Sequence, residues 1–142
     1  MTDQADSERY MKMARRWFTE GWSGNIALAD DLFSENVRTN GVLVGVAGPK
    51  RRIQERLAGF PNLTTTTEHM FSAQDKIRTR PVGRGTHTGP YRSVKASGKP
   101  TEVRDYAVWR FEDGKVTEIS TIQDQFALPK QIGYLPRRVY AA

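Results

Sequence analysis

Cysteine is absent from this chain of 142 residues. Its absence excludes disulfides, thiolate metal centres and a cysteine nucleophile, and it favours a cytoplasmic location. Long apolar runs are also missing, since none approaches the about 20 residues of a membrane-spanning helix. The first residues, Met1–Asp6, are polar and acidic, unlike a secretory signal peptide. We therefore expect a cytoplasmic protein with no membrane partner.

Histidine is scarce, with only His69 and His87 in the chain. These residues are far apart, and no set of carboxylates at ligand spacing accompanies them, so the sequence predicts no metal site. The glycines at positions 83–89 lack the G-x-G-x-x-G spacing and the following helix of a dinucleotide site. No motif for haem, flavin or non-haem iron is present, and we expect no cofactor.

The formal net charge is +6, from 22 basic and 16 acidic residues. A basic surface attracts nucleic acid, but there is no zinc-finger spacing, aromatic-basic string or recognition helix. The basic residues are spread along the chain, with local concentrations at Lys50–Arg52 and Arg137–Arg138. We interpret them as solvated surface or as a means of steering anionic substrates, and expect no nucleic-acid partner.

The first half of the chain reads as helical. Apolar residues at positions 10, 13, 14, 17 and 18 form an i, i+3, i+4, i+7, i+8 stripe, which predicts a helix over residues 6–20. Asn25 could cap a short second helix through 29–33. Pro49 suits the first turn of a third helix that starts at Gly48 and ends before Pro61. Two short strands are expected between these helices, at 37–40 and 42–46.

The second half reads as β-structure. The expected strands cover residues 64–72, 76–87, 101–111 and 115–123. Asp113-Gly114 lies between the last two, and Asp-Gly is a strong hairpin signal. Helices followed by long antiparallel strands predict a single α+β domain over residues 1–142.

Several strings occur together in an informative order: Gly48-Pro-Lys50, Gly85-Thr-His-Thr-Gly89, Trp109-Arg-Phe-Glu-Asp-Gly-Lys115, then Asp124 and Gln131-Ile-Gly133. In this order the chain resembles the SnoaL-like family of NTF2-like proteins. The resemblance implies a conical α+β barrel in which N-terminal helices pack on a strongly bent, mainly antiparallel sheet. It also implies an apolar interior and a homodimer.

Members of that family act on aromatic polyketides in antibiotic biosynthesis. Some are cyclases that close a ring by aldol condensation, while a sister branch is linked to hydroxylation of anthracyclines. The cyclases resemble this chain around the last hairpin, but carry histidines at the positions of Ala107 and Ile119 and the catalytic Asp at that of Thr121. Asp124 matches a different carboxylate, three residues beyond. The resemblance therefore favours the hydroxylase branch.

Asp105 is the leading candidate for a catalytic acid or base. It alternates with Ala107 and Trp109, so all three side chains are expected on one face of a strand. Apolar surroundings would destabilise its charged form and bring its pKa into the range useful for proton transfer. Alternatively, Asp105 forms a structural ion pair with Arg104 or Arg78.

Two further candidates, Asn40 and Trp22, each allow a functional and a structural interpretation. Asn40 could bind a substrate oxygen, or be the turn residue that Asn-Gly favours. Trp22 could stack on a planar substrate, or belong to the core. Thr121 is a candidate hydrogen-bond partner of a substrate oxygen, and a further set is predicted to contact the substrate: Trp109, His87, Ile119 and Ala107.

The sequence thus predicts cofactor-independent hydroxylation of an aromatic polyketide of the anthracycline type. O2 would supply the oxygen, and a separate reductase would supply the reduced substrate. Two alternatives stay open. One is a cyclase whose acid has moved to Asp105 or Asp124, and the other is a non-catalytic module that binds a small ligand.

Overall fold

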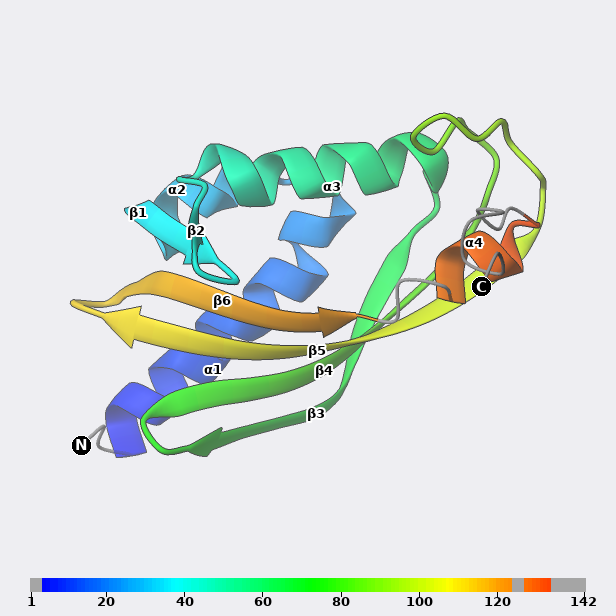
Figure 1. Cartoon of the computed structure of the whole chain (residues 1–142). Helices are drawn as coiled ribbons and strands as arrows, with labels where there is room; N and C mark the ends of the chain where they lie inside the picture. Colours follow the sequence, from blue (N-terminus) through cyan, green and yellow to red (C-terminus); the bar gives the residue numbers. More distant parts are fainter. Residues whose placement is uncertain (1–3, 124–126, 134–142) are drawn as a thin grey trace, which may run out of the picture.

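The computed structural model describes residues 4–123 and 127–133 (Figure 1). The elements follow in the order α1 (Gln4–Thr19), the 3-10 turn η1 (Gly21–Ser23), α2 (Leu28–Leu32), β1 (Phe33–Thr39), β2 (Val42–Leu43), α3 (Ala47–Gly59), β3 (Thr64–Ala73), β4 (Lys76–Thr86), β5 (Pro100–Glu112), β6 (Lys115–Gln123) and α4 (Ala127–Gln131). The predicted α+β class is confirmed, with the helices concentrated in the first half and long strands in the second.

The strands form one curved sheet in the order β2-β1-β6-β5-β4-β3. Every neighbouring pair is antiparallel except β1 and β6, which run parallel. The register shifts in β1, in β3 and near the end of β5, and such irregularities bend a strand and increase its twist. The result is the bent, mainly antiparallel sheet that the family resemblance implies.

Helix α1 covers one face of the sheet with its apolar stripe. Trp17 and Phe18 are buried, and their rings meet Phe33 and Trp109 edge-on, at centroid distances of 4.9 and 5.5 Å. The Trp109 indole N–H donates to the Thr79 hydroxyl at 3.0 Å, which satisfies the one polar group of that side chain. The largest aromatic residues therefore form the core between α1 and the central strands.

Two local predictions were wrong. Phe33 was expected to end a helix, but it begins β1, because it pairs in parallel with Val116 and its ring is buried. The strand expected over residues 42–46 ends at Leu43. Both Val44 and Gly45 donate their backbone N–H to the Val37 carbonyl, at 3.2 and 3.1 Å, and this turn leads directly into α3.

A second, smaller core lies where α3 ends and the segment between β4 and β5 crosses it. It contains Phe60, Tyr91, Val103 and, from α4, Leu128. Gly89 donates its N–H to the Gly59 carbonyl at 3.1 Å, and a Cβ on Gly89 would overlap the Ala58 carbonyl oxygen. The close crossing of these two segments therefore requires glycine.

Helix α4 is held against the exposed edge of β5 beyond the end of β6. The Gln131 amide oxygen accepts from the Glu102 N–H at 2.7 Å, and its NH2 donates to the Glu102 carbonyl at 2.8 Å. The Gln131 side chain thus makes the two backbone hydrogen bonds that one residue of a neighbouring strand would make with Glu102. Across the described ranges, no helix combines the length and the apolar character needed to span a membrane.

Candidate functional site

A cavity of about 280 Å³ lies between α1, α3 and the concave side of the sheet. Its lining comes from every layer of the fold: Trp17, Phe18, Trp22, Thr39, Val44, Gly48, Pro49, Arg51, Arg52, Glu55, Pro81, Asp105, Ala107, Trp109, Ile119 and Thr121. Aromatic and aliphatic groups dominate this lining, and the charged groups are few. Such a composition is typical of a small-molecule site.

The sheet wall of the cavity is formed by β5 and β6. Ala107 is the register partner of Thr121, and Trp109 is the partner of Ile119, so the four side chains form one patch. Asp105 comes two residues before Ala107 in β5, on the same face of the strand, and also lines the cavity. The shared face predicted for Asp105, Ala107 and Trp109 is therefore confirmed.

Asp105 forms an ion pair with Arg52 of α3, with 3.5 Å between the carboxylate and guanidinium atoms. Both side chains are partly buried, at 20% and 35% exposure. Burial lowers the pKa of the Arg52 guanidinium, the Asp105 charge raises it, and the nearby Arg56 lowers it further. The pair thus spans the cavity from helix to sheet.

The ion-pair partners expected from the sequence were wrong. Arg104 binds Glu68 at 2.7 Å, and Arg78 donates to Gln74 at 3.0 Å. Arg104 immediately precedes Asp105 in the extended strand β5, so its side chain leaves the opposite face of the sheet. Sequence neighbours in β5 therefore could not reach the Asp105 carboxylate, whereas a helix 53 positions earlier does.

Trp22, in η1, lines the cavity together with three other aromatic residues, Trp17, Phe18 and Trp109. A planar ligand would therefore meet aromatic side chains on both the helical and the sheet side. A smaller hollow of about 30 Å³ continues past Trp22 and Asp105 and adds Arg56 to the lining. The cationic groups that line the two hollows thus all come from α3.

Asn40 lies beside the cavity without lining it. It occupies the first turn position between β1 and β2 at φ 51°, with Gly41 next at φ 81°. Its amide nitrogen donates to the Thr121 hydroxyl at 3.1 Å, and its amide oxygen accepts from the Thr121 N–H at 2.8 Å. The backbone of Asn40 is therefore that of the turn residue that Asn-Gly favours. Its side chain contacts the site only through Thr121.

His87 lies outside the lining of either hollow. It is fully buried in the second core, where its ring stacks on Phe60 at 5.2 Å. Its Nδ1 accepts from the Ser97 N–H at 3.1 Å, which places the ring proton on Nε2. Of the eight site residues predicted from the sequence, the structure brings six into the cavity and leaves Asn40 and His87 outside it.

Sequence reasoning missed the three charged residues that α3 contributes: Arg51, Arg52 and Glu55. A signal was present, because Gly48, Arg52 and Glu55 have the i, i+4, i+7 spacing of one helix face. Asp124 and Arg137–Arg138 lie outside the described residues. Within the described part, no group of three His, Asp or Glu side chains could hold a metal ion.

The chain matches a protein-family model over most of its length. The model of the SnoaL-like polyketide cyclase family matches residues 12–132. A search of curated protein sequences gave no match.

Several solved structures share the fold. A "putative SnoaL-like polyketide cyclase" from Jannaschia sp. CCS1 is 22% identical, with a TM-score of 0.82 over 96% of this chain and 99% of its own. AclR, a "putative hydroxylase" from Streptomyces galilaeus, is 21% identical, with a TM-score of 0.71 over 91% and 93%. IdmH, a "putative polyketide cyclase" from Streptomyces antibioticus, is 24% identical, with a TM-score of 0.73 over 89% and 97%. At these identities the likeness shows the fold alone.

Proposed function

Since the chain belongs to the SnoaL-like polyketide cyclase family, we propose that it is an enzyme that modifies an aromatic polyketide inside the cavity. The reaction we propose is hydroxylation of an anthracycline-type ring system by O2 without a cofactor bound to this subunit. A separate reductase would supply the substrate in its reduced, hydroquinone form. The similar fold of AclR, a "putative hydroxylase", supports this proposal.

The observation that carries the proposal is the chemistry of the sheet wall. Ala107, Ile119 and Thr121 line the cavity together, and the family resemblance places the cyclase histidines and catalytic Asp at these positions. None of the three side chains here titrates at physiological pH. The aldol acid–base set is therefore replaced by two apolar groups and a hydroxyl, and Asp105 is the carboxylate that the sheet wall retains.

Asp105 is the proposed base. Arg52 at 3.5 Å favours the ionised carboxylate, which is the form able to accept a proton from a hydroquinone hydroxyl. Trp22 and Trp109 would hold the planar rings between them. Because the Thr121 oxygen accepts from Asn40, its own proton can be donated to a substrate oxygen that becomes negative.

The proposed reaction balances without a further reductant. The deprotonated hydroquinone passes electrons to O2, and a carbon–oxygen bond forms at a ring carbon to give a hydroperoxide. Cleavage of the O–O bond then releases water and leaves a hydroxylated quinone. O2 accepts four electrons in all, two from the oxidised C–H bond and two from the hydroquinone, and the proton taken by Asp105 leaves in the water.

The test is mass spectrometry of an anthracycline incubated with this protein and a quinone reductase, under air and under argon. We expect a gain of one oxygen atom only in air and only with the protein present. The Asp105→Asn variant should lose turnover by about a hundredfold, the lower range of general-base contributions. Arg104→Gln, on the opposite face of the same strand, is the matched control and should keep its activity. No oxygen gain in either gas would sink the proposal for that substrate.

A cyclase is the second candidate, favoured by the match to the cyclase family model. In that case Asp105 would remove a proton from an acidic carbon beside a carbonyl, and ring closure would proceed equally under argon. An open-chain polyketide that closes its ring in both gases, with Asp105→Asn inactive, would identify this reaction. Stoichiometric binding without turnover of either substrate would identify a binding module.

A further inference from the structure

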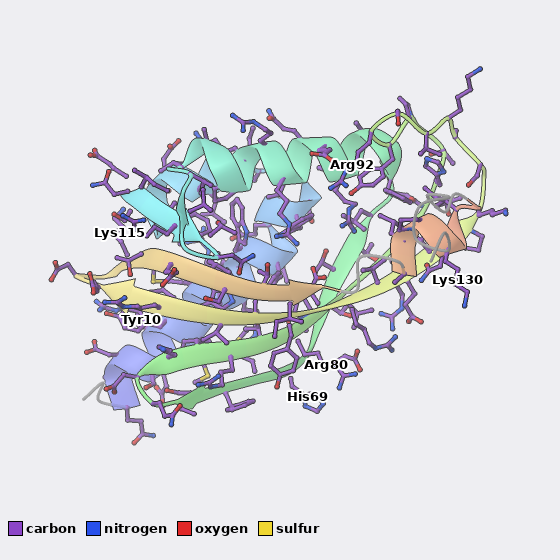
Figure 2. All side chains as sticks on the ribbon, viewed as in Figure 1. Tyr10, His69, Arg80, Arg92, Lys115 and Lys130 are labelled. Atoms are coloured by element: carbon purple, nitrogen blue, oxygen red, sulfur yellow. The ribbon has the colours of Figure 1, made fainter. Side chains whose placement is uncertain are left out.

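Guanidinium groups are concentrated on one side of the cavity. Arg51 and Arg52 of α3 line the cavity itself, and Arg56, one turn further along α3, lines the smaller hollow beside it. Arg92 approaches from the segment between β4 and β5, near the C-terminal end of α3 (Figure 2). On the opposite sheet wall, Ala107, Trp109 and Ile119 form an apolar patch, and Asp105 and Thr121 are its polar neighbours.

Two carboxylates face these four guanidinium groups, and both are already engaged. Glu55 is held by Arg92 at 2.6 Å, and Asp105 is held by Arg52 at 3.5 Å. Arg56 lies over the Tyr91 ring, 5.6 Å from its centroid. Among the described residues, neither Arg51 nor Arg56 has a carboxylate partner. This side of the cavity therefore carries an excess of positive charge.

The excess has an energetic consequence at Arg52. Burial lowers the pKa of its guanidinium, the Arg56 and Arg92 charges lower it further, and Asp105 is the main group that acts against them. A guanidinium that is partly desolvated among like charges gains from a second anionic partner. The Arg52 guanidinium has five N–H donors, and the contact with Asp105 uses only part of them. A second anionic group can therefore bind to the remaining donors.

We infer that the ligand of this cavity is a planar aromatic compound with an anionic oxygen, carboxylate or ionised phenol, directed toward Arg51, Arg52 and Arg56. This inference rests on the proposed function for the aromatic part and goes beyond it by naming the charge and its orientation. The rings lie against Trp22 and Trp109, and the anionic group lies against α3. Orientation in turn decides which ring carbon faces Asp105.

A pair of probes isolates the charge: 9,10-anthraquinone-2-carboxylate and its neutral carboxamide. All three tryptophans of the chain line the cavity, so quenching of their fluorescence reports binding, and calorimetry confirms it. We expect the carboxylate to bind about tenfold more tightly, as one additional charge-assisted contact would give. Raising the ionic strength should reduce this preference, because the rim at Arg51 is exposed.

Variants assign the preference to particular residues. Arg51→Gln and Arg56→Gln should each reduce the preference for the carboxylate by several-fold and leave carboxamide binding within about twofold. Lys50→Gln is the matched control, because Lys50 adjoins Arg51 but pairs with Asp30, at 3.0 Å, rather than lining the cavity. Circular dichroism of each variant verifies the fold.

Equal affinity for the two probes would overturn the inference. So would an equal loss in Lys50→Gln, which would show that the overall basic charge, and not the cavity, attracts the anion. The outcome is separable from the proposed reaction. Preference for the carboxylate without oxygen gain by any substrate would sink only the hydroxylase, and oxygen gain without the preference would sink only this inference.

Discussion

Asn40 and Thr121 exchange two hydrogen bonds although 81 positions separate them in the chain. A third bond, from the Asn40 N–H to the Ile119 carbonyl at 3.0 Å, joins the same turn to β6. The turn between β1 and β2 is thereby fixed to the strand whose Ile119 and Thr121 line the cavity. We propose that Asn40 acts as a positioning residue, because the hydrogen bond that it donates orients the Thr121 hydroxyl.

We predict that Asn40→Gly lowers the free energy of unfolding by about 1–3 kcal/mol, because two hydrogen bonds are lost while the left-handed backbone is kept. Asn40→Ala should cost about 1 kcal/mol more, since alanine disfavours φ 51°. Turnover should fall in both variants. It should fall by a similar factor in Thr121→Val, which does not strain the turn. Chemical denaturation and product formation provide the two readouts. An Asn40→Gly protein as stable and active as the wild type would contradict this account.

His87 allows a test that separates stability from binding. His87→Phe keeps a ring against Phe60 but leaves the Ser97 N–H without its acceptor, so we expect a loss of about 1–3 kcal/mol in stability. KM should stay unchanged, because the ring lies outside both hollows. A several-fold rise in KM at unchanged stability would instead support the substrate contact expected from the sequence.

The elements that were predicted well depend on local signals. Asp113-Gly114 adopts positive φ at both positions, 52° and 79°, as the two-residue hairpin requires, and the strands on either side begin and end within a few residues of the expected bounds. Pro49 lies in the first turn of α3, where its missing N–H costs nothing. Each of these signals acts over a few residues and is visible in one stretch of sequence.

The errors and omissions depend on contacts between distant segments. Phe33 belongs to a strand because Val116 pairs with it, and Arg52 belongs to the site because Asp105 faces it across the cavity. Neither partner can be identified from local periodicity, which gives the face of an element but not what lies opposite. The sheet wall was predictable by alternation, whereas the helix wall needed the packing of α3 over the sheet.

The outer face of the sheet leads to a prediction on assembly. Tyr106 and Ile122 are register partners that point away from the cavity, and they are 44% and 77% exposed. Arg80 and His69, which are partners on β4 and β3, point away from α3 (Figure 2). The family resemblance implies a homodimer, and we propose that the second copy of the chain covers this exposed face.

Ile122→Asp should therefore shift a dimer to a monomer, because a carboxylate would be buried without a partner. Val42→Asp is the control, since Val42 is 62% exposed but lies on the edge strand β2, which β1 separates from β6. Analytical ultracentrifugation provides the measurement. A wild-type protein that stays monomeric at high concentration, or an equal effect of both variants, would contradict the proposed interface.

An isotope experiment tests the proposed hydroxylation by following both oxygen atoms of O2. An anthracycline is reduced to its hydroquinone under argon, mixed with the protein, and exposed to 18O2 in a single turnover. We predict one 18O atom in the product and one in water, with the yield of hydroxylated product falling about a hundredfold in Asp105→Asn but not in Arg104→Gln. A product that contains no 18O, or one that forms equally well with Asp105→Asn, would contradict the account.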